Sequence, residues 1–290
     1  MTDTQLAKEI AAQIRAEHTS VGLPFRLEKG EAGLRESKVG GDPYLPRDME
    51  WPLDRQGVPL RLLAQVDCAA LSALEDFPHT GLLQFWIGTD DLYGADYDDP
   101  IPQRDFRVLY HEGADPTVTQ AEVLAKRSAL PDGEEERYSP LGDWPCRMVF
   151  GQPRTEWIPD ENYLFQKRLV QLWNQRRPEK PIRSVWDFYA LFPREERDYS
   201  IFELSGAEVT GSPRGPWHQL GGFPTFIQND PRHEEEYQDL DTLLFQLDSE
   251  FQNREDLVLW GDCGIGNFFI GREALKHRDF SRVMYNWDCS

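Results

Sequence analysis

The sequence predicts a single α+β domain, residues 1–290, built from two copies of one strand-rich motif. The sequence GGDP at 40–43 recurs as GGFP at 221–224, and LLAQVD at 62–67 recurs as LLFQLD at 243–248. Both motifs therefore repeat 181 residues later, and a shared offset indicates an internal duplication. We expect pseudo-twofold symmetry, with the following parts: repeat 1 at about 23–112, a helical insertion at about 113–216 and repeat 2 at about 217–290.

Apolar runs bounded by Gly, Pro and Asp are typical of half-buried or central strands, and they occur in both copies. They predict strands at 60–67, 82–87 and 106–111 in repeat 1, and at 243–248, 257–260, 267–270 and 283–287 in repeat 2. Short helices are expected at 69–75 and 273–276.

Helical periodicity appears outside the strand-rich segments. Leu6, Ile10 and Ile14 lie one turn apart and predict an amphipathic helix over residues 4–18. In the insertion, similar spacing predicts helices at 162–176 and 184–191, with prolines between them.

Composition limits the classes of partner. The chain has 51 acidic and 31 basic residues, a formal charge of −20, so its field repels nucleic acid and anionic membranes. The same field attracts a basic protein, a polyamine or a cation, although solubility alone also accounts for excess carboxylate. No cofactor motif is present. Four separated cysteines without a C-x-x-C pair, and no long apolar run, predict a cytoplasmic protein with reduced thiols.

The segment 90–99 is the most acidic part of the chain. Its five carboxylates belong to Asp90, Asp91, Asp96, Asp98 and Asp99. Repeat 1 has 16 residues between Gly88 and Asp105, where repeat 2 has seven between Gly271 and Asp279. Three interpretations remain open: a solvated loop anchored by Tyr93 and Tyr97, a protein-recognition loop, or a cation site without the residue order of an EF-hand.

Two further polar groups are candidates for a site. The glycine-rich segment 260–267 holds Asp262 and Asn267, and it resembles a tight hairpin more than a phosphate cradle. Cys263 in this segment would serve as a nucleophile only with a base such as His218 beside it. Gln65 and Gln246 lie at equivalent strand positions, where they either fix the GG-x-P turn of their own copy or line a groove between the copies.

These motifs together resemble the YwqG-like family of bacterial cytoplasmic proteins. The similarity rests on segments 38–46, 63–67, 81–85, 90–94 and 285–289 and so covers nearly the whole chain. The resemblance implies an α+β domain of unknown function without established catalytic residues, and some relatives near secreted-toxin systems imply toxin neutralisation.

We therefore expect a non-catalytic, acidic protein-binding module, immunity-like against a basic toxin. The alternatives are an enzyme with its site between the repeats and a cation-binding protein that uses the 90–99 loop. No catalytic residue, metal ligand or cofactor is assigned, and the oligomeric state is left open.

Overall fold

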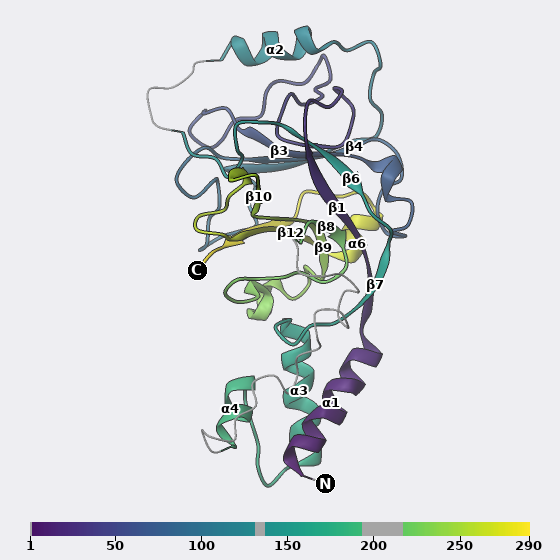
Figure 1. The fold of residues 1–290 in the computed structure, drawn as a ribbon, viewed down its shortest axis with the longest axis vertical. Coiled ribbons are helices and arrows are strands. Elements are labelled where there is room, and N and C mark those ends of the chain that lie inside the picture. Colours follow the sequence, from purple (N-terminus) through teal and green to yellow (C-terminus); the bar gives the residue numbers. More distant parts are fainter. Residues whose placement is uncertain (1, 131–136, 193–216) are drawn as a thin grey trace.

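The computed structural model describes residues 2–130, 137–192 and 217–290. Its main element is one antiparallel sheet of eleven strands, which curls until it is nearly a closed barrel (Figure 1). Neighbouring strands follow the order β13-β12-β9-β8-β1-β6-β2-β3-β4-β5, and β7 pairs with β1. The α+β class is confirmed.

The strands are β1 (Thr19–Lys29), β2 (Lys38–Val39), β3 (Arg61–Asp67), β4 (Leu82–Ile87), β5 (Phe106–His111), β6 (Cys146–Phe150), β7 (Arg154–Trp157), β8 (Gln219–Gly221), β9 (Thr242–Asp248), β12 (Ile265–Ile270) and β13 (Val283–Asp288), with a separate hairpin of β10 (Glu250–Gln252) and β11 (Glu255–Val258). The helices are α1 (Asp3–Glu17), α2 (Gln120–Ser128), α3 (Tyr163–Arg176), α4 (Val185–Ala190) and α6 (Arg272–Lys276), with short 3₁₀ turns η1 (Cys68–Leu71), η3 (Pro231–His233) and η4 (Glu235–Tyr237).

Strands β2–β5 and strands β8, β9, β12 and β13 have the same pairing pattern. Lys38 pairs with Gln65 in the first group, and Gln219 pairs with Gln246 in the second. The register of β3 against β4 shifts at Leu63, and the register of β9 against β12 shifts at Leu244. A β-bulge bends its strand and increases the local twist, so both groups curl at the same point.

The two GG turns are fixed in the same way. All four glycines have φ between 63° and 72°, the left-handed region that favours glycine. The side-chain carbonyl of Gln65 accepts a hydrogen bond from the backbone N–H of Tyr44 (2.9 Å), and that of Gln246 accepts one from Thr225 (2.8 Å). Because both glutamines are 0% exposed, their amides satisfy backbone groups that water cannot reach.

Strands β1 and β6 join the two groups. Phe25 on β1 donates its N–H to the carbonyl of His218 (3.1 Å), and Met148 on β6 donates to Ser37 (3.2 Å). The inner faces then pack on one another, with the rings of Phe85 and Phe245 stacked 4.5 Å apart. One apolar core therefore lies between the inner faces of the two groups.

Helices α1 and α3 pack together beyond one end of the sheet, with α4 beside them (Figure 1). Their apolar faces form a second core that includes Ile10, Phe165 and Trp173. Thr2 begins α1 as an N-cap with a capping box to Gln5, which explains why the helix begins there. The amphipathic helices predicted at 4–18, 162–176 and 184–191 are confirmed.

Several sequence-based expectations need correction. The range 113–216 is not purely helical, because β6 and β7 lie in it and both pair with β1. The segment 260–267 does not form a hairpin between its flanking strands, since β11 pairs with β10 whereas β12 pairs with β9 and β13. The expected helix at 69–75 is only the short turn η1.

We expect Lys38→Gln to be tolerated and Lys38→Met to be destabilising. Lys38 is 1% exposed, and its Nζ donates to the carbonyls of Gly33 (2.7 Å) and Asp42 (2.8 Å). In the second group, Gln219 occupies the equivalent position and donates a hydrogen bond to the carbonyl of Phe223 (2.8 Å). Met at position 38 would leave the carbonyls of Gly33 and Asp42 without this donor. Urea unfolding of both variants checks this; equal stability of the two would contradict it.

The same lysine predicts a pH dependence. Burial lowers the pKa of Lys38 to about 8, against the opposing charges of Asp42, Glu36 and Glu31. The unfolded chain keeps this proton up to a pH of about 10.4, so between these values it binds more protons than the folded protein. The free energy of unfolding should therefore rise with pH from 8 towards 10, and this slope should be smaller in Lys38→Gln.

Candidate functional site

The acidic loop, residues 88–105 between β4 and β5, is folded by two of its own aspartates. One carboxylate oxygen of Asp90 accepts from the N–H groups of Leu92 (2.9 Å) and Gly94 (2.8 Å). One oxygen of Asp96 accepts from Asp98 (3.3 Å) and Asp99 (3.2 Å). These aspartates act as local turn formers, so they are not all available to a partner.

Gly94 marks the tightest point of the acidic loop. It has φ 79°, and a Cβ there would lie 2.1 Å from the carbonyl oxygen of Asp105. Only glycine fits this approach, which closes the base of the loop.

Two arginines offset part of the loop's charge. Arg55 pairs with Asp96 and Asp105, and Arg104 pairs with Asp99 (3.0 Å). Burial opposes ionisation of Asp96, but hydrogen bonds from Arg55 and from the backbone of Asp98 and Asp99 outweigh it and lower its pKa. In the described part of the chain, no side chain pairs with the exposed carboxylates of Asp91 and Asp98.

Aromatic side chains fasten the acidic loop to β13, in the other half of the molecule. The Tyr93 ring packs against Trp287 (5.0 Å between centroids) and Trp260 (5.7 Å). The Tyr97 hydroxyl donates to the carbonyl of Trp287 (2.9 Å), and the Trp287 indole donates to the carbonyl of Leu92 (2.8 Å). The loop thus covers the edge of β13, where a further strand would otherwise pair.

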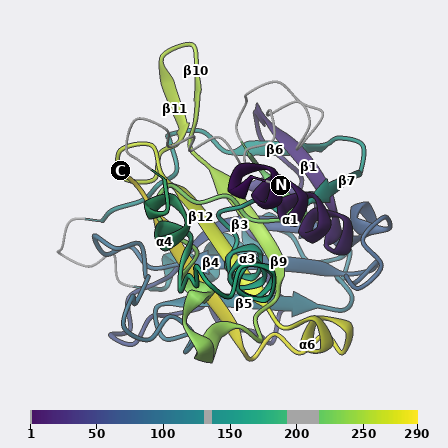
Figure 2. The same cartoon turned by 90° about the horizontal axis from the view of Figure 1, so that it is seen from below.

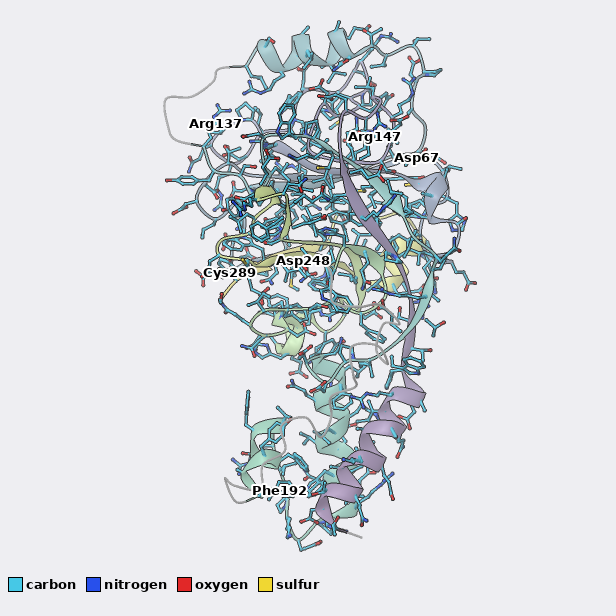
Figure 3. The ribbon with its side chains drawn as sticks, in the orientation of Figure 1. Asp67, Arg137, Arg147, Phe192, Asp248 and Cys289 are labelled. Atoms are coloured by element: carbon cyan, nitrogen blue, oxygen red, sulfur yellow. The ribbon has the colours of Figure 1, made fainter. Side chains whose placement is uncertain are left out.

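Asp262 lies beside the end of the same strand. A Cβ on Gly261 would approach Cys289 Sγ to 2.7 Å, so the 261–264 turn packs on Cys289, which lies at the margin of the molecule (Figure 3). The Asp262 backbone favours the Cys289 thiolate, but burial and the carboxylates of Asp262 and Asp288 outweigh it and raise the thiol pKa. The acidic loop and the 261–264 turn, which are far apart in the sequence, therefore meet at the end of β13.

We call this surface the acidic face. It comprises the exposed carboxylates of Asp90, Asp91, Asp98, Asp99 and Asp262 with the exposed apolar groups of Leu92 and Tyr97. Leu92 is 41% and Tyr97 is 51% exposed. Carboxylates around partly exposed apolar groups suit a basic protein segment with some apolar residues.

Three other predicted site residues lie away from this face. Gln65, Gln246 and Asn267 are 0% exposed and bond to backbone groups within their own half. They hold the GG turns and line no groove between the halves.

His218 is likewise occupied. Its Nε2 lies 2.8 Å from a carboxylate oxygen of Glu250, and its Nδ1 accepts from the N–H of Asp248 (3.0 Å). Both ring nitrogens therefore have partners other than Cys263, which is exposed on its turn. Across the described residues, no three His, Cys, Asp or Glu side chains group as a metal site would require.

A pocket of about 480 Å³ lies between the α3–α4 lobe and the segment 228–233. No motif in the sequence predicts this pocket, because its walls come from three separate segments. One wall residue is Trp186 on α4, which is 69% exposed. An exposed Trp on an amphipathic helix was the available signal.

The comparisons with known proteins bear on family alone. Within the described residues no helix has both the length and the apolar character to cross a bilayer. None of the curated proteins compared with the chain matches it. A family model described as a domain of unknown function, DUF1963, matches residues 37–289, which is most of the chain. The chain therefore belongs to the DUF1963 family.

Proposed function

We propose that this protein is a cytoplasmic, non-catalytic module that binds a basic protein segment on the acidic face. The observation that supports this most is the preorganised acidic loop: Asp90 and Asp96 fold it, while Asp91 and Asp98 remain exposed beside Leu92 and Tyr97. A loop already held in one conformation loses little conformational entropy on binding.

Long-range charge supports the same proposal. A chain with a formal charge of −20 attracts a cationic partner and accelerates their encounter. An immunity-like role against a basic toxin is the most concrete form of this function, and it agrees with the resemblance to YwqG-like proteins, which we take to be the same family as DUF1963.

The test is a titration of a fluorescein-labelled peptide of alternating Arg and Leu, followed by fluorescence anisotropy. Raising NaCl from about 0.1 M to about 1 M shortens the Debye length from about 10 Å to about 3 Å, so the affinity should fall at least tenfold. A peptide with Gln in place of each Arg is the control and should not bind. Binding that is insensitive to salt, or equal for both peptides, would contradict the proposal.

The finer architecture is also a proposal. We infer that the two halves arose by duplication of one unit. The first strand of each copy, β1 in the first and β6 in the second, then exchanged places, so that β1 pairs with β8 and β6 pairs with β2. Three features support this inference: the two halves have β-bulges at equivalent positions, their GG turns have the same conformation, and the hydrogen bond from Phe25 to His218 is equivalent to that from Met148 to Ser37. The tolerance of Lys38→Gln tests one such equivalence.

A further inference from the structure

The pocket between the α3–α4 lobe and the segment 228–233 has the chemistry of a cation site. Its walls include the carboxylate of Asp160 and the aromatic rings of Trp186 and Tyr189. Among the lining residues that the structure describes, none is Lys or Arg. Asp230 also borders the pocket, but Arg232 already pairs with it at 2.8 Å.

Asp160 supplies a half-buried carboxylate to the pocket wall. No side chain in the described part of the chain donates a hydrogen bond to it. Burial raises its pKa, against the opposing effects of its own backbone N–H and of Arg15. A cation placed beside a partly desolvated carboxylate makes a charge-assisted hydrogen bond, which is stronger than one between neutral groups.

The walls supply aromatic faces to the same space. Trp186 is 69% exposed, the most of the large apolar side chains in the described residues. Its ring lies 6.3 Å from that of Tyr189 at an interplanar angle of 50°. Aromatic faces attract guanidinium and ammonium groups, and Trp does so best.

Gln228 links the pocket wall to the end of β13, which borders the acidic face. Gln228 lines the pocket, and its Nε2 donates to the carbonyl of Cys289 (2.6 Å) at the end of β13. Its backbone N–H donates to Asp288 (2.6 Å) on the same strand. Both ribbon views place α4 on the side of the molecule where the chain ends (Figures 1 and 2).

We propose that this pocket binds a guanidinium or ammonium group, with Asp160 as its ionic partner and Trp186 as its aromatic wall. The further step, that the group is an Arg or Lys side chain of the partner held by the acidic face, rests on the proposed function. A single basic segment would then contact the acidic face and anchor one side chain in the pocket.

The probe for the pocket itself is N-acetyl-L-arginine amide, and its neutral counterpart with citrulline in place of arginine is the control. Calorimetric titration should give saturable binding of the arginine compound and at least tenfold weaker binding of the citrulline compound. Asp160→Asn should weaken arginine binding about tenfold and Trp186→Ala about fivefold. Trp144→Ala, which removes another exposed Trp, should leave it unchanged.

Asp160→Asn is expected to fold, because it breaks no side-chain hydrogen bond in the described structure, and circular dichroism verifies this. Absence of saturable binding, equal binding of the citrulline compound, or an equal effect of Trp144→Ala would overturn the site.

The Arg-Leu peptide separates the two sources of the cationic group. If Asp160→Asn weakens binding of both the peptide and the arginine compound, the pocket anchors a partner side chain. If it weakens only the arginine compound, that step is overturned and the pocket takes a free small cation. Asp91→Asn with Asp98→Asn should weaken the peptide and spare the arginine compound, so failure of the acidic face is distinguishable from failure of the pocket.

Discussion

Replacing Arg232 by Met should lower the free energy of unfolding by about 3–5 kcal/mol, because it leaves a buried carboxylate without its partner. The side chains of Arg232 and Asp230 are each 2% exposed. Nε and one terminal nitrogen of the guanidinium donate to the two Asp230 oxygens at 2.9 and 2.8 Å. The guanidinium also lies 4.3 Å from the centre of the Phe269 ring.

The pair also positions α3, since Asp230 accepts from the N–H of Tyr163 (3.2 Å) at its first turn. Urea unfolding followed by Trp fluorescence measures the effect. The double variant Arg232→Met with Asp230→Leu should be less destabilised than the sum of the single variants, because it leaves no unpaired charge. Arg282→Met, which removes an exposed pair with Asp239, should cost less than about 1 kcal/mol. Additive single effects would contradict this account of the buried pair.

Replacing Gln65 by Leu should lower the free energy of unfolding by about 3 kcal/mol or more, since each buried polar group left unpaired costs about 1–3 kcal/mol. Gln65 accepts from Tyr44 and from Gln84 (2.8 Å), and it donates to the carbonyls of Leu34 (2.9 Å) and Glu36 (3.0 Å). Leu has nearly the same volume, so the loss comes from these four unpaired groups.

Gln246→Leu should also lower the free energy of unfolding, but by less, because in the described structure the Gln246 side chain bonds only to Thr225 and Trp217. The exposed Gln56→Leu is the control and should change stability by less than about 0.5 kcal/mol. The measurement is the same urea titration. A Gln65→Leu protein as stable as the wild type would show that these amides do not hold the GG turns.

Much of the strand content could be predicted from local pattern. Strands β3, β4, β5, β9, β12 and β13 coincide with apolar runs bounded by Gly, Pro and Asp. Local pattern does not predict strand β1, because Pro24 within it argues against a strand even though Val21, Leu23, Phe25 and Leu27 alternate. Strand β6 is only five residues long and pairs with strands far away in sequence, so local pattern gave little sign of it.

The surroundings of the candidate site could not be predicted, because they depend on contacts between distant segments. Tyr97 and Trp287 are 190 residues apart and meet only when the sheet curls. The sequence pointed correctly to Tyr93 and Tyr97 as groups that touch the body, but not to the strand edge that they cover. The composition of the β11–β12 connection favours a hairpin, but turn composition does not determine which strands pair.

The most direct test of the central claim compares two variants of equal charge. The first changes three exposed carboxylates of the acidic face, Asp91→Asn, Asp98→Asn and Asp99→Asn, and the second changes three exposed carboxylates elsewhere, Glu9→Gln, Glu31→Gln and Asp48→Asn. Affinity for the Arg-Leu peptide at about 0.1 M NaCl should fall at least tenfold in the first variant and less than about twofold in the second. The reason is that a surface charge farther from the bound peptide than a Debye length is largely screened. Equal losses in the two variants would show that net charge alone attracts the peptide and would contradict binding at the acidic face.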